Sequence, residues 1–329
     1  MGGWIKGFGM ALVMSGAWMG LSAFEAPPEV IKIALQEGDT AAWELAAMHE
    51  LALDEINEIE LKIRNVADSK AGQAALQAGK VDVIVSDVVW TSLQRAQGAD
   101  FTLVPHSLAV GGLMVMPASK VASVVDLKGA TLAAADWPVD ISYLILQAYY
   151  NAKTGGDLTK DASTAFGAPP LVNEQLAGGQ ADASLNFWHF NARAAVAGAM
   201  QIISVQDMLK DLGVSKTPPL LGWVFSNTYA AKKPEVITNF LNASFQTKAA
   251  LLTDDALWEK IRPVMDVEDD DLFIALRDAY RAGIVTTSTD ADIQAATETY
   301  ALLAKFGDAD LTGGNPDLAA GTFWADYRK

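Results

Sequence analysis

The sequence predicts an α/β protein of two lobes, in which each lobe is a mixed, mainly parallel sheet flanked by helices and a ligand cleft lies between the lobes. The main observation is an internal repeat, because residues 176–186 repeat the pattern of residues 76–86 at an offset of 100 (176 − 76). Both copies read as a helix end, a glycine stop at Gly79 or Gly179, an aspartate and a short apolar strand. A repeat of this length indicates duplicated lobes and not a solenoid.

The opening strands of the two lobes show the same offset, since residues 31–35 match residues 131–135. The carboxyl ends of parallel strands meet at one edge of a sheet, where α/β proteins bind ligands. The length of 329 residues exceeds the usual size of one domain and agrees with two lobes. We expect lobe one to comprise residues 24–117 and 220–329, and lobe two residues 118–219.

The elements of each lobe follow from apolar periodicity and from capping residues. Asp39 or Thr40 suits the cap of the first helix, Asp68 or Ser69 the cap of the second, and Pro234 the first turn of a later one. The sequence predicts for lobe one strand 31–35, helix 41–53, strand 61–66, helix 69–77 and strands 81–85, 101–105 and 111–116. For lobe two it predicts strand 131–135, helix 141–151, strand 163–166, helix 171–177 and strand 181–185. A return strand at 220–225 and helices at 234–252, 256–261, 270–282 and 290–305 complete the chain.

The first 23 residues have the pattern of a secretory signal peptide. Lys6 precedes the uncharged apolar run 7–22, and small residues at 21–23 offer a cleavage site. An N-terminal membrane anchor or an unusual cytosolic start are the alternatives. We expect residues 1–23 to be a signal peptide and the protein to reach the periplasm.

Composition excludes several classes of partner and site. The net charge of −16 argues against nucleic acid and anionic lipid as partners. With no Cys there is no disulfide and no thiolate metal site. Because no phosphate-binding glycine motif and no zinc-protease motif is present, we predict neither a cofactor nor a metal.

Three short motifs extend the pattern of the repeat. They are Asp-Leu-Lys-Gly at 126–129, a Trp-bearing loop at 186–191 and Gly-Thr-Phe-Trp at 321–324. Together with the repeat they resemble the nitrate/taurine/aliphatic-sulfonate (NitT/TauT) type of periplasmic substrate-binding protein. The resemblance implies a periplasmic binding protein type II fold, a monomer that binds a small molecule between its lobes, and delivery to an ABC transporter permease and its ATPase. The implied mechanism is closure of the lobes on the ligand.

By this resemblance, the loops after the first and third strands of each lobe contact the ligand. Carried onto this sequence they are residues 36–40, 86–90, 136–140 and 186–191, with Trp223 of the return strand at the border of the hinge. The candidate binding residues are therefore Glu37, Asp39, Thr40, Ser86, Asp87, Trp90, Asp136, Trp137, Asp140, Asn186, Trp188, His189 and Trp223.

The residue types in these loops indicate the kind of ligand. Acids and Trp are present and Lys and Arg are not, which differs from what a purely anionic ligand requires. A Trp face attracts cations and planar rings by about 0.5–2 kcal/mol, and a carboxylate binds a hydrogen-bond donor. The ligand is thus expected to be an amine, a zwitterion (including an aminosulfonate) or a nitrogen heterocycle. Asp39 and Asp140 also suit helix caps, Trp90 and Trp188 also suit packing, and His189 also suits a surface or capping position.

Two other functions use the same architecture. One is an enzyme similar to pyrimidine-precursor synthases or menaquinone-pathway enzymes, with His189 and an aspartate as acid and base. The other is a sensor subunit that reports ligand occupancy to a membrane receptor. The signal-like N-terminus and the absence of a Cys-based or metal-ligand cluster favour a binding protein over an enzyme.

Overall fold

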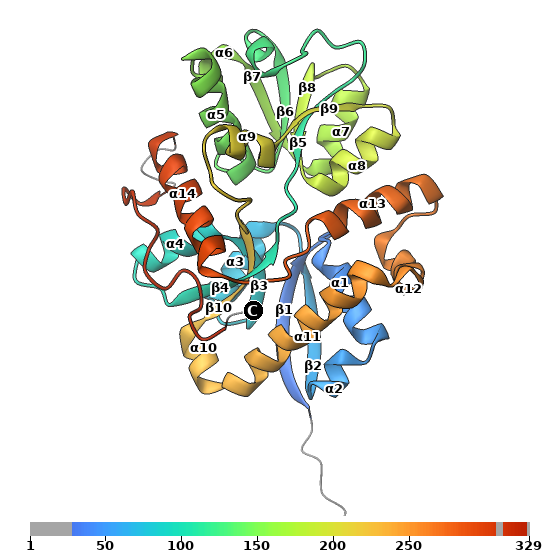
Figure 1. Ribbon diagram of the computed structural model, residues 1–329, viewed down its shortest axis with the longest axis vertical. Coiled ribbons are helices and arrows are strands. Elements are labelled where there is room, and N and C mark those ends of the chain that lie inside the picture. Colours follow the sequence, from blue (N-terminus) through green and yellow to red (C-terminus); the bar gives the residue numbers. More distant parts are fainter. Residues whose placement is uncertain (1–27, 307–311, 328–329) are drawn as a thin grey trace, which may run out of the picture.

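A computed structural model of the chain describes residues 28–306 and 312–327. Two sheets of five strands each form two lobes, and helices cover both sheets (Figure 1). The fold is the predicted two-lobed α/β architecture. The expected signal peptide at 1–23 lies outside the described residues. Within the described residues, no helix has the length and apolar character needed to cross a membrane.

The sheet of lobe one has the order β2-β1-β3-β10-β4. Strand β1 is parallel to both β2 and β3, while β10 is antiparallel to β3 and β4. The return strand predicted at 220–225 is β10, so the last strand of this sheet comes from a segment far along the chain. The strands are β1 (Glu29–Gln36), β2 (Ile59–Val66), β3 (Val83–Asp87), β4 (Phe101–Ser107) and β10 (Leu221–Ser226).

The sheet of lobe two repeats this topology in the order β7-β6-β8-β5-β9. Strand β6 is parallel to β7 and β8, and β5 is antiparallel to β8 and β9. The antiparallel strand β5 thus corresponds to β10 of the other lobe. The strands are β5 (Gly112–Val115), β6 (Thr131–Ala135), β7 (Ser163–Gly167), β8 (Ala183–Asn186) and β9 (Met200–Ser204).

Most helices follow a strand of their own lobe and cover its sheet (Figure 1). Two of them begin where the sequence suggested loops, because residues 86–90 and 186–191 run directly from a strand into α4 and α8. The helices are α1 (Ala41–Glu50), α2 (Leu53–Ile56), α3 (Ser69–Gln77), α4 (Val88–Ala96), α5 (Ile141–Thr154), α6 (Leu158–Asp161), α7 (Pro169–Ala177), α8 (Trp188–Val196), α9 (Val205–Asp211), α10 (Asn227–Lys232), α11 (Pro234–Thr253), α12 (Asp255–Met265), α13 (Asp270–Ala282) and α14 (Asp290–Phe306), with the 3-10 turn η1 (Val124–Leu127).

The repeated aspartates explain why the two lobes share a sequence pattern. Asp82 accepts a hydrogen bond from the backbone N–H of Lys32 at 2.9 Å, and Asp182 accepts one from Thr131 at 2.8 Å. Each aspartate thereby joins the loop before one strand to the neighbouring parallel strand. The preceding glycines have φ values of 63° and 69°, in the left-handed region that lets a helix end without strain.

The chain crosses between the lobes twice. It leaves lobe one at residues 108–111, so β5 lies in the second sheet although the expected boundary placed residues up to 117 in lobe one. It returns through residues 212–220. Gly111 is required at the first crossover, because a Cβ there would lie 1.6 Å from the backbone oxygen of Asn186.

Helices near the C-terminus bind both crossovers. The N–H of Leu108 donates to Gly283 O at 2.8 Å, and the N–H of Ser215 donates to the Glu298 carboxylate at 3.0 Å. Helix α13 also packs on α8 of lobe two, and α14 contacts α4 and α5. The segment 220–329, expected in lobe one, therefore supplies two helices that touch both lobes (Figure 1).

Candidate functional site

Contacts that cross from one lobe to the other lie next to the loops predicted to bind the ligand. Lys70 of α3 places its ammonium 3.8 Å from the centre of the Trp137 ring, which belongs to the loop after β6. Trp43 of α1 meets Trp188 of α8 with ring centroids 5.8 Å apart. The carboxyl ends of the strands therefore face each other across the gap between the lobes, as expected for this fold.

Three aspartates at this edge accept backbone N–H groups at the starts of helices. Asp39 accepts from Ala41 at 2.9 Å, Asp87 from Trp90 at 2.8 Å, and Asp140 from Ser142 at 2.9 Å. All three are half-buried. The helix-cap role that the sequence left open for Asp39 and Asp140 is present.

The pKa values of these acids show that carboxylates from both lobes interact. Burial raises the pKa of Asp140 to about 7, and the charges of Asp136 in the same lobe and Asp87 in the other lobe add to the rise. Burial raises the pKa of Asp39 to about 6. Burial raises the pKa of Asp87 as well. Carboxylates that repel one another across a gap favour a cation or a hydrogen-bond donor between them.

Asp136 and Trp137 project from the turn after β6. Asp136 adopts a φ of 60°, a left-handed conformation that is uncommon outside glycine, asparagine and aspartate. Its pKa is raised by burial and by Asp68 of lobe one, and lowered by Lys70. Trp137 is 40% exposed, and the ammonium of Lys70 lies over its ring.

Aromatic side chains form another part of the interlobe edge. Trp188 is half-buried and touches the rings of Trp43 and Tyr280 edge to face, at 5.8 and 6.0 Å between centroids. His189 lies against Phe187 and Phe190. Burial and the charge of Arg193 lower the pKa of His189 to about 3, so its imidazole is neutral, and its Nδ1 atom has no hydrogen-bond partner among the described residues.

Trp223 was expected at the border of the hinge, and this prediction is wrong. Its side chain is fully buried in lobe one, packs on His106 and Phe240, and donates from Nε1 to Ser244 Oγ at 3.1 Å. The return strand β10 lies between β3 and β4 in the middle of the sheet, so this side chain faces the core.

Other predicted residues at the edge are structural or peripheral. Asn186 is 2% exposed and donates to Pro169 O and Asn173 Oδ1 at 2.9 and 2.8 Å. Ser86 is buried and accepts from the Gln73 amide at 3.2 Å. The Trp90 ring stacks on Phe101 at 5.6 Å, against the core of lobe one. Glu37 is exposed, and the half-buried Thr40 precedes α1 without capping it through its side chain.

A buried polar network lies behind the first helix of lobe one. The carboxylate of Glu44, which is fully buried, accepts from Lys248 at 2.8 Å, from Tyr280 at 3.2 Å and from Ser244 at 2.5 Å. Burial, together with Lys248, lowers the pKa of the adjacent His106. The network joins α1, α11 and α13, and through Tyr280 it reaches Trp43 and Trp188 at the interlobe edge.

Sequence reasoning missed several residues of the interlobe edge. Asp68 and Lys70 follow the second strand, whereas only the loops after the first and third strands were considered. Trp43 was not among the candidate residues, because a Trp within a helix usually packs in the core, but its ring contacts a residue of the other lobe. Tyr280 belongs to a C-terminal helix whose position across both lobes had no signal in the local pattern.

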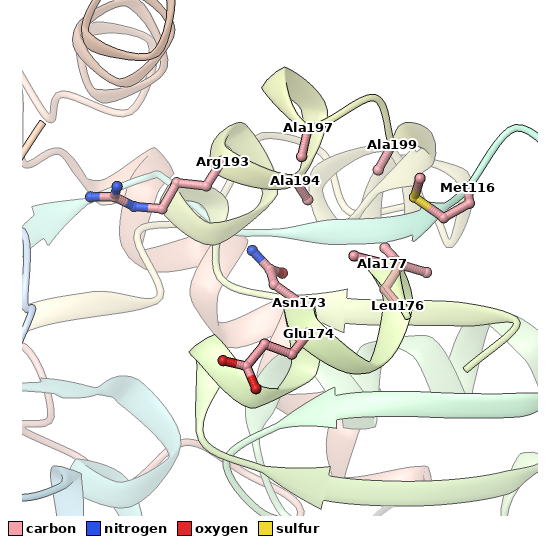
Figure 2. A pocket seen from close by; sticks show the side chains of 9 residues that line it. All are labelled: Met116, Asn173, Glu174, Leu176, Ala177, Arg193, Ala194, Ala197 and Ala199. Carbon is pink, nitrogen blue, oxygen red and sulfur yellow. The ribbon is translucent and has the colours of Figure 1, made fainter. Parts of the chain in front are cut away.

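A small cavity lies elsewhere, on lobe two between α7 and α8 (Figure 2). Its volume is about 220 Å³, and alanines together with Met116 and Leu176 form most of its wall. The guanidinium of Arg193 points away from these side chains (Figure 2) and donates to Met265 O at 3.3 Å. None of the predicted site residues lines this cavity.

Comparison with known proteins places the chain in a family. The family model described as NMT1/THI5 like matches residues 55–254, which is more than half of the 329-residue chain. The chain belongs to the NMT1/THI5-like family. No curated protein sequence matches it.

Solved structures share the fold of this NMT1/THI5-like protein. The alkanesulfonate-binding protein SsuA from Xanthomonas axonopodis pv. citri bound to MOPS has a TM-score of 0.71 and 18% identity, covering 91% of this chain and 99% of that chain. The periplasmic aliphatic sulphonate binding protein SsuA from Escherichia coli has a TM-score of 0.68 and 18% identity, covering 91% and 98%. The ligand-binding component of an ABC-type import system from Staphylococcus aureus with zinc bound has a TM-score of 0.67 and 13% identity, covering 90% and 96%.

The predicted resemblance to substrate-binding proteins of the nitrate/taurine/aliphatic-sulfonate type is confirmed by the family match and these structures. The same fold also carries an enzyme, because the desulfurization enzyme DSZB matches with a TM-score of 0.57 and 13% identity, covering 89% of this chain and 95% of that chain. These identities establish the shared fold, and the ligand has to be argued from the residues of this NMT1/THI5-like chain.

Proposed function

We propose that the protein is the extracytoplasmic solute-binding subunit of an ABC importer, acting in the periplasm as a monomer. It binds a small molecule between its lobes, and the closed form is recognised by the permease and its ATPase. The family match and the structural likeness to import-system binding proteins support this proposal. A ligand shifts the lobes toward closure only through its greater affinity for the closed form.

The ligand proposed is an amine, a zwitterion such as an aminosulfonate, or a nitrogen heterocycle. The observation that carries this choice is that the charges of half-buried carboxylates from both lobes, Asp87 on one side and Asp136 on the other, raise the pKa of Asp140. A cationic group between them relieves their repulsion, which a purely anionic ligand increases. The Trp137 ring, which already attracts the Lys70 ammonium, is a surface suited to a cation or a planar ring.

Binding is proposed in preference to catalysis because the acid and base considered for an enzyme are not assembled. His189 contacts aromatic rings, is held neutral by burial and Arg193, and makes no Nδ1 hydrogen bond within the described residues. No group of three or more His, Asp or Glu suited to a metal occurs in the part of the chain that the structure describes.

Thermal unfolding in the presence of candidate ligands tests this proposal. The panel comprises primary amines, aminosulfonates, alkanesulfonates without an amine, and nitrogen heterocycles. A ligand at 100 times its Kd adds about 2.7 kcal/mol to the free energy of unfolding. We expect a shift with amine-bearing or heterocyclic compounds, and a shift with the amine-free sulfonates alone would refute the proposed ligand class.

Two variants with the same cap chemistry locate the binding site. Asp87→Asn keeps a helix cap but removes a charge at the interlobe edge, and we expect it to lose most of the ligand-induced shift. Asp269→Asn is the matched control, because Asp269 caps α13 with the same 2.8 Å bond but is exposed, whereas Asp87 is half-buried. Equal loss in both variants would show that the interlobe carboxylates do not bind the ligand.

A further inference from the structure

The contact between Lys70 and Trp137 links the two lobes at the mouth of the proposed site. Lys70 is in the first turn of α3 in lobe one, and its Nζ lies 3.8 Å from the ring centre of Trp137 in lobe two. This distance is within the range in which an ammonium is attracted by the ring face. The contact therefore favours approach of the two lobes.

The charges around this contact explain why a cation lies there. Asp68 and Asp136 approach from opposite lobes, and the charge of Asp68 raises the pKa of Asp136 whereas the charge of Lys70 lowers it. Lys70 forms no ion pair within 4 Å among the described residues, and its side chain is exposed. Its ammonium is thus held mainly by the ring and by the general field of the carboxylates.

We propose that Lys70 is an internal competitor for the cationic end of the ligand. Its ammonium occupies the place over Trp137 that a ligand ammonium takes, and it holds the lobes together when the site is free of ligand. This inference rests on the proposed ligand class, which it deepens by assigning the Trp137 face as the ammonium subsite and Lys70 as a determinant of affinity.

The competition follows from geometry and charge. Two ammonium groups on the same ring face repel each other at close range, so a ligand cation has to displace Lys70. The flexible four-carbon stem and the solvent-exposed position of Lys70 allow the displacement without moving α3. Lys70 thereby lowers the affinity of the site for the ligand.

The absence of cysteine allows the lobe positions to be measured cleanly. Glu55→Cys on α2 and Ala152→Cys on α5 place spin labels on exposed positions of lobe one and lobe two in a chain with no other Cys. Pulsed electron paramagnetic resonance then gives the distance between the lobes without ligand. We expect Lys70→Met to shift this distribution to longer distances, and the exposed Lys80→Met, beyond the end of the same helix, to leave it unchanged.

Titration with tetramethylammonium chloride tests the competition itself, with neutral tert-butanol as the control of similar shape. We expect Lys70→Met to bind tetramethylammonium about 2- to 5-fold more tightly, the change that one cation–ring contact is worth. Trp137→Leu should abolish tetramethylammonium binding in both backgrounds, and tert-butanol should show no difference between the proteins.

Three results would overturn the inference. They are an unchanged lobe distance in Lys70→Met, tetramethylammonium binding that is equal or weaker in Lys70→Met, and no tetramethylammonium binding to either protein. The proposed function is tested separately, because it is refuted only if the amines and heterocycles of the thermal panel also fail to bind.

Discussion

Trp43 of lobe one and Trp188 of lobe two meet edge to face, with ring centroids 5.8 Å apart and ring planes at 85°. Trp43 lies in the first turn of α1, and Trp188 is the first residue of α8. Trp43 is 4% exposed and also touches Trp258 and Tyr280, whereas Trp188 is half-buried. The contact therefore joins a buried residue of one lobe to a more accessible residue of the other.

Replacing these two residues should have unequal effects. Trp43→Ala removes a buried ring and is expected to lower the free energy of unfolding by about 3–5 kcal/mol. Trp188→Ala should lower it less and should mainly lengthen the distance between the lobes. A double-mutant cycle by urea unfolding is expected to give a coupling of about 0.5–1.5 kcal/mol for the ring pair. Strict additivity would show that the ring pair contributes no coupling to the free energy of unfolding.

Lys248 should be needed for the stability of the fold only while the Glu44 carboxylate is charged. Lys248→Met leaves the fully buried Glu44 carboxylate without its cation, and we expect a loss of about 3–5 kcal/mol in urea unfolding. Glu44→Gln in the Lys248→Met background should recover most of this loss, because the amide can still accept from Ser244 and Tyr280.

The exposed pair Lys233–Glu29 is the matched control for the buried one. Both side chains of this pair are about half exposed, at 42% and 57%. Lys233→Met should change the free energy of unfolding by about 0–1 kcal/mol. An equal loss in Lys233→Met and Lys248→Met would contradict the role assigned to burial.

Ionisation of Asp140 should lower the free energy of unfolding as the pH rises. Its pKa is raised to about 7 in the folded protein, above the ordinary aspartate value near 3.8, so the folded protein keeps a proton that the unfolded chain has lost. The free energy of unfolding therefore falls between about pH 4 and pH 7 and then levels off. Asp140→Asn keeps the helix cap and should remove this decline, so that the variant is the more stable protein at pH 8.

Asp157, another helix cap of lobe two, should behave in the opposite way. Lys160 and Thr159 lower the pKa of Asp157, so its contribution is present above the unfolded pKa and is lost as pH falls. Asp157→Asn should therefore be less stable than the parent at pH 8. Chemical unfolding at pH 5, 6, 7 and 8 distinguishes the two variants, and a parallel response would show that the charge of Asp140 is not disfavoured by its surroundings.

Gly111 should tolerate no side chain. A Cβ at this position would lie 1.6 Å from Asn186 O, which belongs to the backbone and cannot rotate away. Gly111→Ala must displace the crossover from the end of β8, and we expect a loss of stability well above that of Gly129→Ala. Gly129 has a φ of 79° and open space around it, so its replacement should cost about 1–2 kcal/mol through backbone strain alone. Similar losses in both variants would contradict this close approach.

Much of the fold was predictable because the two lobes share local signals. The repeated glycine stops and the aspartates Asp82 and Asp182 act within their own sheets, so their pattern is visible in the sequence. Trp223 was misplaced because a strand pattern does not reveal which strands flank it. Placing β10 in the middle of the sheet makes both of its faces core.

The interlobe site was predictable only in part. Asp39, Asp87 and Asp140 lie at or just after strand ends, and this position in the sequence is what made them candidates. Lys70 and Tyr280 reach the site through the relative placement of the lobes and of α13, which no local periodicity encodes. The starts of α4 and α8 were taken for loops because polar and aromatic residues there hide the helical pattern.

The position of β10 also governs the order in which the chain can fold. The sheet of lobe two is built from one continuous stretch, so it can form as soon as its last strand has been synthesised. The sheet of lobe one lacks the strand between β3 and β4 until residues 221–226 emerge, by which time all of lobe two has been made. During that interval β4 has no hydrogen-bonding neighbour, and the nascent protein exposes an unpaired edge that chaperones, proteases or another chain can bind.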